Sequence, residues 1–338
     1  MNRIVIPQLG RTIAVGPGET ILAKALDAGI PYPHGCRSGR CGACKSRLLD
    51  GEVELLPHTR FALSPAERAQ GLVLACRAVP QSDGTIVWLS GEDEVADIPV
   101  RRLSGRIAAI ESATHDVRLV RVALADRSAF RFKPGQYARL TFPGTPSRDY
   151  SMANDPEDDL LEFHIRRVPG GAATGRIFRD AAVGDPVTVE GPLGSAFLRE
   201  KHAGPILAVA GGSGLAPIKA IVGTALANGM RQPIHVYFGA RAERDLYLVD
   251  HFRRLEAANP GLRFVPVLSA AAEADVRSGT VSDAVAADVS DLDGWKAYVA
   301  GPPAMVGATG AALLERGMRS ADIHADVFFT PDQQVSPS

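Results

Sequence analysis

Three of the four cysteines in this chain of 338 residues lie in one short loop, and this cluster restricts the N-terminal fold more than any other feature. The stretch CRSGRCGACK runs from Cys36 to Lys45 with the spacing C-x4-C-x2-C, and the last cysteine is Cys76. Four cysteines are too few to staple a chain of this length with disulfides. The cluster therefore indicates metal binding or catalysis.

The spacing favours an iron–sulfur cluster over zinc. Zinc sites favour two knuckles with two ligands each, whereas here one loop offers three cysteines and a later segment offers the fourth. C-x4-C-x2-C with a distant cysteine is the pattern of plant-type [2Fe–2S] sites. Gly39 and Gly42 let the backbone approach the sulfur atoms and turn its N–H groups toward them. The predicted metal ligands are Cys36, Cys41, Cys44 and Cys76.

Composition and charge exclude several classes of protein. The chain is 46% hydrophobic and 22% charged with a net charge of −1, so it has no overall field for nucleic acid or a membrane surface. No apolar run approaches the roughly 18 residues that a bilayer-spanning helix needs. The N-terminus MNRIVIPQLG lacks the apolar core of a secretory signal. We therefore expect a protein of the reducing cytoplasm, with no membrane or nucleic-acid partner.

Three compositional blocks predict domains at 1–93, 100–199 and 200–330, followed by a disordered tail at 331–338. The second block is a run of short strands separated by Gly and Pro, which predicts an antiparallel barrel. The third block alternates strands with helices, which predicts a parallel sheet of the doubly wound type. Its expected strands are PILAVA, PIHVYFGA, LRFVPVLS and KAYVAG, and its expected helices are APIKAIVGTALANG, LYLVDHFRRLEAANPG and PPAMVGATGAALLERG.

The first block predicts a small α+β unit. RIVIP and RTIAV form an expected β-hairpin, and ETILAKALDAG is an expected helix that ends at Gly29. Further strands are expected at KSRLLDG, GLVLACRA and TIVWL. SPAERAQ is an expected helix in which Ser64, Pro65 and Glu67 make a capping box. With its cysteine spacing, this block resembles a plant-type ferredoxin domain with the β-grasp fold.

The cysteine loop is also basic, because it carries Arg37, Arg40, Lys45 and Arg47 against a single acid. One interpretation is a rim that only keeps the loop soluble. The other is a docking face for an acidic electron acceptor, since complementary charge steers encounter. The sequence leaves both open.

The motif R-x-Y-S at Arg148, Tyr150 and Ser151 follows an expected strand that ends in TFPGTPS. It resembles the flavin motif of the ferredoxin–NADP reductase superfamily. The resemblance implies that Arg148 meets a flavin phosphate, because arginine binds phosphate bidentately. It also implies that Tyr150 lies flat against the isoalloxazine ring and that the Ser151 hydroxyl reaches the flavin N5 region.

The segment HIRRVPGGAATGRIF supports the same site. It predicts a strand, a glycine pair and a helix opened by Thr174, and Gly171-x-x-Thr174 at a helix N-terminus is a typical anion site. In the superfamily this stretch holds the flavin phosphates, so the resemblance implies that role for Gly171 and Thr174. It also implies that His164 and Ile165 face the flavin ring with their backbone.

ILAVAGGSGLAPI predicts a strand, a glycine-rich turn and a helix. Gly212, Gly214 and Pro217 occupy the fixed positions of the dinucleotide fingerprint G-x-G-x-x-G, with Pro in place of the last Gly. Proline is accepted in the first turn of a helix. The segment resembles the pyridine-nucleotide motif of the same superfamily.

The next strand ends in YFGARAERDLY, at the edge that reads the adenosine ribose in the superfamily. NADPH enzymes place Ser and Arg there to meet the 2′-phosphate, whereas NADH enzymes often carry an acid. Arg241, Glu243, Arg244 and Asp245 give a mixed pattern. We expect NADH, with Asp245 or Glu243 as the acid and Arg241 as a further contact.

Two C-terminal segments extend the resemblance. AGPPAMV resembles the C-G-x-P segment beside the nicotinamide, with Ala300 in place of the usual Cys and the backbone turn kept at Gly301 and Pro303. IHADVFFT matches an acid-x-aromatic ending at Asp326 and Phe328. The resemblance implies that Phe328 covers the flavin face that the nicotinamide enters. The alternative for Phe328 is a core position on an edge strand.

The order of these motifs resembles the reductase components of bacterial aromatic-ring oxygenase systems, of the naphthalene dioxygenase type. The resemblance implies that NADH reduces FAD (with FMN as the alternative), and that a [2Fe–2S] cluster passes single electrons to a ferredoxin or a Rieske-type terminal oxygenase. Ser151 and Phe328 would serve the hydride step. The alternatives are the reductase of a diiron hydroxylase and, from another class, a zinc-stapled nucleotide-sensing protein.

Overall fold

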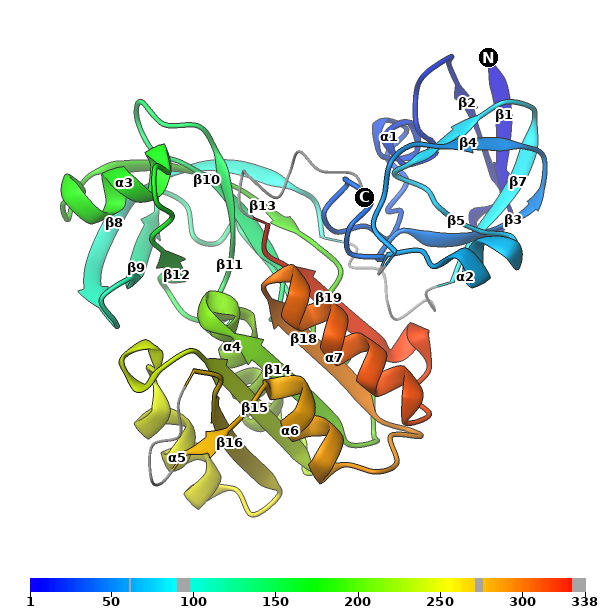
Figure 1. The fold of residues 1–338 in the computed structure, drawn as a ribbon. Helices are drawn as coiled ribbons and strands as arrows, with labels where there is room; N and C mark the ends of the chain where they lie inside the picture. The colour runs from blue at the N-terminus through cyan, green and yellow to red at the C-terminus, as the bar shows by residue number, and fades with distance from the viewer. Residues whose placement is uncertain (61, 90–97, 271–275, 330–338) are drawn as a thin grey trace. The chain divides into compact units, whose positions relative to one another are not determined.

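The computed structural model describes residues 1–60, 62–89, 98–270 and 276–329 and divides the chain into two compact units (Figure 1). The described residues of the first unit are 1–60 and 62–89, and those of the second are 98–270 and 276–329. The acidic stretch GEDEVAD and the expected disordered tail lie outside the described residues. Among the described residues, no helix has the length and apolar character needed to cross a bilayer. The expected boundaries at residues 93, 100, 199 and 200 stay predictions.

The first unit is built on a mixed five-stranded sheet. Its order is β2-β1-β7-β3-β5, and β1 is antiparallel to β2 but parallel to β7. Helix α1 (Ile21–Asp27) buries its apolar side in the core that this sheet forms. The arrangement confirms the predicted β-grasp fold. The strands are β1 (Asn2–Ile6), β2 (Arg11–Val15), β3 (Lys45–Asp50), β5 (Leu72–Leu74) and β7 (Gly84–Trp88), with a separate pair formed by β4 (Val53–Leu55) and β6 (Ala78–Pro80).

Helix α2 (Pro65–Ala69) begins with the predicted capping box. The Ser64 hydroxyl accepts a hydrogen bond from the Glu67 N–H, and the Glu67 carboxylate accepts one from the Ser64 N–H. Two backbone N–H groups that a helix start would leave without partners are satisfied in this way.

The segment around Cys76 differs from the sequence-based expectation of one continuous strand. Strand β5 ends at Leu74, and the chain turns through Ala75–Arg77 before β6 begins. The Ala75 N–H donates to the Cys44 carbonyl at 3.1 Å, a contact that the turn makes available. The turn thus brings Cys76 back to the cysteine loop, which a straight strand would leave behind.

The second unit begins with an antiparallel six-stranded sheet in the order β11-β10-β13-β8-β9-β12. Its end strands meet at a single bridge between Met152 and Phe163, which closes the sheet into the predicted barrel around an apolar core. The strands are β8 (Arg101–Ser112), β9 (Val117–Leu124), β10 (Tyr137–Thr141), β11 (Arg148–Ser151), β12 (Leu161–Arg166) and β13 (Pro186–Leu193), with helix α3 (Ala172–Arg179) before the last.

A parallel six-stranded sheet follows in the order β17-β16-β15-β14-β18-β19, which confirms the predicted doubly wound type. Strands β14 and β18 are buried along their whole length, so both faces of the sheet are covered. The strands are β14 (Ile206–Gly211), β15 (Ile234–Ala240), β16 (Leu262–Leu268), β17 (Arg277–Ser278), β18 (Lys296–Gly301) and β19 (Ile323–Val327). The helices are α4 (Leu215–Ala227), α5 (Val249–Ala258), α6 (Val281–Asp288) and α7 (Pro303–Glu315).

Helix α6 and the short edge strand β17 were not expected from the sequence. The hydroxyl of Thr280 caps α6 by accepting a hydrogen bond from the Asp283 N–H at 3.2 Å. The helix packs against α7. Its eight residues are too few to show a clear helical repeat, so the capping residue Thr280 was the sequence signal that indicated this helix.

The glycine-rich turn packs directly against strand β18. The turn forms the short helix η3 (Gly212–Gly214) between β14 and α4. A Cβ added at Gly214 would lie 2.1 Å from the Ala300 carbonyl oxygen. Gly301 has a φ of +147°, and a Cβ added there would lie 3.0 Å from the Gly211 carbonyl oxygen. Two backbones meet here in a space that no side chain can enter.

This contact predicts that substitution by alanine has very different effects on stability at two glycines that are nine residues apart in sequence, Gly214 and Gly223. Gly214→Ala should destabilise the second unit by roughly 3 kcal/mol, because the methyl group meets backbone that cannot move aside. Gly223→Ala, on α4 with open space around it, should be neutral or stabilising by up to about 1 kcal/mol. Urea unfolding of the cofactor-loaded chain, followed by flavin fluorescence, measures both. Equal stability of the two variants would contradict the close packing.

Candidate functional site

The four cysteines lie in two pairs. Cys36 and Cys41 are half-buried in the loop, whereas Cys44 and Cys76 are buried. The Cys36 N–H donates to Cys41 Sγ at 3.3 Å, and the pKa of Cys44 is raised by its neighbour Cys76. Each pair can supply two thiolates to one iron, so the donor set fits a [2Fe–2S] cluster.

Backbone N–H groups of the loop point at Cys36 Sγ. The N–H groups of Ser38 and Arg40 donate to it at 3.5 and 3.3 Å. The hydrogen bond with the Cys41 thiol and these donors lower the pKa of Cys36 to about 5, against the opposing effect of burial. A loop that directs N–H donors at a sulfur atom suits thiolate ligands.

The two glycines of the loop have the conformations that their predicted role requires. Gly39 and Gly42 have φ values of +75° and +78°, in the region that favours glycine. A Cβ added at Gly39 would lie 2.7 Å from the Arg77 side chain. The Gly39 carbonyl also accepts a hydrogen bond from the Thr59 N–H at 2.9 Å, which fastens the loop to the segment before α2.

The basic residues of the loop differ in how much charge they present. Lys45 Nζ lies 2.6 Å from Glu67 Oε1 with the lysine side chain 12% exposed, so this charge is largely neutralised. Arg40 is half-buried, and Arg47 is exposed and donates to a backbone carbonyl. Arg37 is exposed in the middle of the loop. The outward charge therefore comes from Arg37 and Arg47 and not from Lys45, and of these two only Arg37 lies between the cysteines of the loop.

The barrel opens beside the R-x-Y-S motif. Beyond the bridge that closes it, the same register would set Ser151 opposite His164 and Tyr150 opposite Ile165, but the described strands share no ladder there. Strand β12 is bonded to β9 on its other side, so its backbone at His164 and Ile165 can meet a ligand in the opening. The side chain of Ile165 points into the barrel core.

The Tyr150 hydroxyl is buried and has no hydrogen-bond partner among the described residues. Burial raises the pKa of Tyr150 to about 12. Leaving such a group without a partner costs roughly 1–3 kcal/mol, which a bound polar ligand would recover. Arg148 is exposed two residues earlier. A ring, a phosphate and hydroxyl groups, as in FAD, fit this combination of side chains.

Helix α3 starts at Ala172 with Gly171 as its N-cap, so Thr174 lies in the first turn and does not open the helix. The Thr174 hydroxyl is engaged with the loop, because it accepts a hydrogen bond from the Val168 N–H at 3.2 Å. Thr174 therefore holds the glycine loop in shape. The backbone at Gly171 and the start of α3 remain the candidate anion site.

The C-terminal segment reaches the barrel at Ser151. Ser151 is 5% exposed, and its hydroxyl donates to Asp326 Oδ2 at 2.6 Å across a sequence separation of 175 residues. Asp326 lies on β19, and the half-buried Phe328 follows that strand with its N–H bonded to the Gly301 carbonyl at 2.9 Å. The acid of the acid-x-aromatic ending is thus bonded to the serine of R-x-Y-S.

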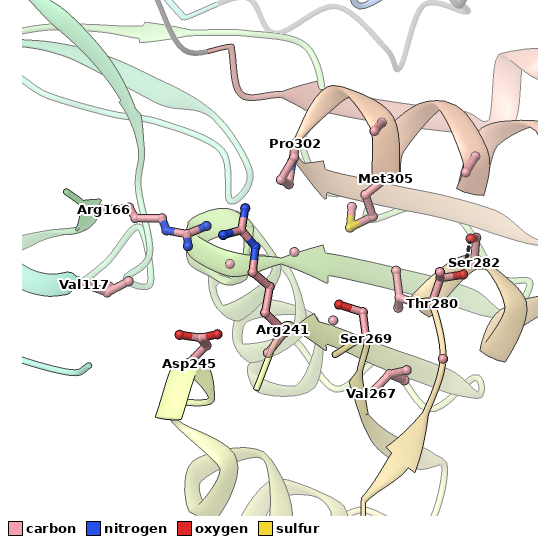
Figure 2. A pocket seen from close by; sticks show the side chains of 18 of the residues that line it. Val117, Arg166, Arg241, Asp245, Val267, Ser269, Thr280, Ser282, Pro302 and Met305 are labelled. Atoms are coloured by element: carbon pink, nitrogen blue, oxygen red, sulfur yellow. Dashed lines mark hydrogen bonds between the residues drawn. The ribbon is translucent and has the colours of Figure 1, made fainter. Parts of the chain in front are cut away.

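A cavity of about 330 Å³ lies at the carboxyl ends of the parallel strands (Figure 2). Its walls include the glycine turn, the ends of β15 and β16 and the starts of α6 and α7. Asp116, Val117 and Arg166 come from the barrel. Ligands of open parallel sheets bind at this edge.

Three of the predicted nucleotide contacts line the cavity: Gly212, Arg241 and Asp245. The other three are buried and shape the backbone: Gly214, Pro217 and Gly301. Asp245 accepts a hydrogen bond from the Ala242 N–H at 3.1 Å, whereas Glu243 is exposed. Of the two acids considered for the ribose, Asp245 is the one in the lining.

Arg166 is a cavity residue that the sequence motifs did not identify. Its guanidinium points toward that of Arg241 (Figure 2), and Asp116 holds it at 2.7 Å. Two facing guanidinium groups are best stabilised by an anion between them, which fits the phosphates of a nucleotide. Strand alternation in HIRRV was the available signal, because it sets Arg166 on the face of His164 and away from the barrel core.

The first unit can hold a centre that exchanges one electron, and the second can hold a flavin beside a pyridine nucleotide. This combination defines an iron–sulfur flavoprotein reductase. Three family models match successive stretches of the chain. They are the 2Fe-2S iron-sulfur cluster binding domain at 4–81, the oxidoreductase FAD-binding domain at 104–197 and the oxidoreductase NAD-binding domain at 208–310.

Characterised relatives cover nearly the whole chain. The reductase component of naphthalene 1,2-dioxygenase/salicylate 5-hydroxylase systems from Ralstonia sp is 40% identical over 328 residues, which is 96% of this chain and 98% of the relative. The reductase subunit of an aromatic O-demethylase from Amycolatopsis sp. is 39% identical over 325 residues, 94% of this chain and 96% of the relative. The chain belongs to the family of reductase components of multicomponent oxygenase systems, of the naphthalene dioxygenase reductase type.

Solved structures agree with this assignment. A cytochrome P450 reductase from Amycolatopsis has a TM-score of 0.76 and 38% identity, with 97% of this chain and 99% of that chain covered. A ferredoxin reductase in carbazole 1,9a-dioxygenase has a TM-score of 0.69 and 29% identity, with 97% and 98% covered. The protein is an electron-transfer oxidoreductase with [2Fe–2S], FAD and NAD domains.

Proposed function

We propose that this chain takes electrons from NADH and delivers them singly to a ferredoxin or a Rieske-type terminal oxygenase of an aromatic-ring-hydroxylating system. The observation that carries the proposal is a nucleotide cavity lined by both the barrel and the parallel sheet. When bound, FAD and the [2Fe–2S] cluster supply the conversion of a hydride donor into single-electron transfers. Reduced thiols are needed for such ligands, so we place the chain in the cytoplasm.

The flavin is assigned to the opening of the barrel. Arg148 would bind its phosphate and Tyr150 would lie against its ring, with the tyrosine hydroxyl gaining the partner that it lacks. The backbone of β12 and the start of α3 complete the site. Ser151 and Asp326 form a hydrogen-bonded pair that can hold a proton beside the reacting edge of the ring.

The nucleotide is assigned to the cavity. Arg166 and Arg241 would bind its phosphates from two sides, and Asp245 would meet the adenosine ribose. The nicotinamide would lie beside the turn at Gly301, which packs on the backbone of Gly211 and leads into Pro302 of the cavity lining. Phe328 would cover the flavin face until the nicotinamide displaces it, and its N–H bond to Gly301 sets it beside that turn.

The partner is assigned from the relatives. The reductase components of naphthalene dioxygenase systems from Ralstonia and Pseudomonas are 40% and 39% identical to this chain, which supports an aromatic-ring dioxygenase. Propane 2-monooxygenase and phenol 2-monooxygenase reductase components are 36% and 35% identical. Because of these relatives, the second candidate for the partner is a hydroxylase of another kind, such as a diiron enzyme.

The proposal predicts two coupled colour changes. The loaded chain should show a flavin band near ~450 nm and broad iron–sulfur absorbance, and anaerobic NADH should bleach both because the two centres share one donor. Cys76→Ala should lose iron and the broad absorbance, while NADH still bleaches the flavin band, since the flavin and nucleotide sites lie in the other unit. A colourless chain with one zinc, or a flavin that NADH leaves oxidised, would reject the proposal.

The choice of NADH predicts a role for charge at Asp245. The chain should use NADH with a kcat/KM at least about tenfold above that for NADPH, because a carboxylate in the cavity repels a 2′-phosphate. Asp245→Asn should lower the ratio of kcat/KM for NADH to kcat/KM for NADPH. The amide oxygen of the new side chain can still accept the hydrogen bond from the Ala242 N–H. Glu243→Gln is the matched control, since Glu243 is exposed and outside the lining. Steady-state rates with a dye acceptor give the ratio, and a preference for NADPH in the unmodified chain would refute the assignment.

The exposed arginine of the cysteine loop predicts a docking effect. Arg37→Glu should slow reduction of the natural protein acceptor about tenfold at low ionic strength and leave dye reduction unchanged, because charge steers only the protein encounter. Arg11→Glu is the control, since Arg11 is exposed on β2 at the opposite edge of the sheet from β5. Stopped-flow rates at two salt concentrations separate the two acceptors. Equal effects of both variants would favour a rim that only solvates the loop.

A further inference from the structure

Strand β12 turns three polar side chains toward the nucleotide fold. Glu162, His164 and Arg166 alternate with residues of the barrel core, so they share one face of the strand. Arg166 lines the nucleotide cavity. Glu162 and His164 are 6% and 4% exposed, and polar groups buried to this degree stay stable only with partners.

Lys219 of α4 is the partner of the Glu162 carboxylate. Its Nζ lies 2.7 Å from Glu162 Oε1 and also donates to the Ala153 carbonyl at 3.1 Å. Arg121 donates to the other carboxylate oxygen at 3.1 Å. The helix that follows the glycine turn is therefore fastened to the barrel by a partly buried ion pair.

His164 connects this pair to Tyr247. Its Nε2 lies 3.2 Å from Glu162 Oε1, and its Nδ1 lies 3.0 Å from the Tyr247 hydroxyl. Burial lowers the pKa of His164, which favours the neutral ring. Nε2–H then donates to the carboxylate, and the single proton of the Tyr247 hydroxyl is shared between His164 Nδ1 and the Gly212 carbonyl oxygen.

Tyr247 ends the chain of contacts at the nucleotide cavity. Its hydroxyl also lies 3.4 Å from the carbonyl oxygen of Gly212, in the glycine turn that lines the cavity. The ring is 5% exposed and packs edge-on against Phe238 of β15 and against His164. One hydroxyl therefore touches both the flavin-binding barrel and the nucleotide-binding turn.

We propose that Tyr247 is a positioning residue for hydride transfer, whose hydroxyl fixes the glycine turn relative to His164 on the barrel and so sets the nucleotide in register with the flavin. This inference rests on the proposed function, because it takes the flavin to sit in the barrel opening. Tyr247 does not line the cavity itself and acts through Gly212.

A purely structural tyrosine would give a different pattern of effects. The Lys219–Glu162 pair keeps the two parts together when the hydroxyl is absent, so a Tyr247→Phe variant should fold. The side chains assigned to the phosphates and ribose are unchanged, so affinity for the nucleotide should persist. Hydride transfer depends on sub-ångström alignment of the reacting atoms, so the rate should fall instead.

The test compares Tyr247→Phe with Tyr237→Phe in the full FAD-loaded chain. Tyr237 is a buried tyrosine of β15 whose hydroxyl donates to Asp288 at 3.0 Å. Like Tyr247, it does not line the cavity. Tyr247→Phe should lower the limiting rate of flavin reduction by NADH about tenfold in anaerobic stopped-flow experiments. The Kd for NAD⁺, measured by calorimetry, should stay within about twofold because no direct contact is lost. Tyr237→Phe should leave both values unchanged.

A second readout does not depend on turnover. In the flavin-free chain, hydrogen exchange at Gly211–Leu215 should accelerate in Tyr247→Phe and not in Tyr237→Phe, because only the first variant frees the turn. His164→Leu should accelerate the same amides, and the double variant should add little to either single change.

The inference is overturned if Tyr247→Phe reduces its flavin at the unmodified rate. It is equally overturned if only the Kd for NAD⁺ rises, or if Tyr237→Phe causes the same slowing. If the unmodified chain itself fails to oxidise NADH, the proposed function has failed. The exchange experiment then still tests whether the Tyr247 hydroxyl holds the glycine turn. Unchanged hydrogen exchange at Gly211–Leu215 in Tyr247→Phe would show that it does not.

Discussion

The arrangement of strand β12 is the constraint on which the second unit depends. Its backbone completes the barrel on one side through β9 but is paired to β11 only at the closing bridge, so the barrel stays open beside Tyr150 and Ser151. Its side chains alternate between the apolar core of the barrel and a polar face that meets α4, Tyr247 and the cavity. A single strand thus lines the assigned flavin site with its backbone and fixes the nucleotide fold with its side chains.

Within the parallel sheet, the turn after β14 meets the end of β18 through backbone and not through side chains. Gly214 and Gly301 let the turn after β14 and the turn after β18 touch, because a Cβ at either position would strike a carbonyl oxygen. The cavity begins where these two turns diverge, at the carboxyl edge of the sheet. Close backbone packing therefore sets one side of the cavity, and Arg166 on the polar face of β12 lines it from the barrel.

Much of this could be predicted from the sequence where the signal is local. The cysteine spacing, the capping box at Ser64 and the glycine turn at Gly212 are read within a few neighbouring residues, and the structure has each element in place. For Arg166 the local pattern indicates only the face of the strand, and Tyr247 has no local signal at all, because the contacts of both depend on residues that only the tertiary fold brings together. Helix α6 and the turn at Cys76 were missed for related reasons, since one is too short to show a repeat and the other bends to meet Cys44.

The two halves of the chemistry place different demands on the chain. A hydride moves only between atoms that are nearly in contact, so its donor and acceptor sites need a rigid common frame. The barrel and the parallel sheet share one unit and are joined by buried bonds at Lys219, Ser151 and His164. A single electron needs no bond between donor and acceptor, and all four cysteines lie in the other unit. The division into units therefore follows the division between two-electron and one-electron steps, with the cysteine loop left to meet its acceptor on its own surface.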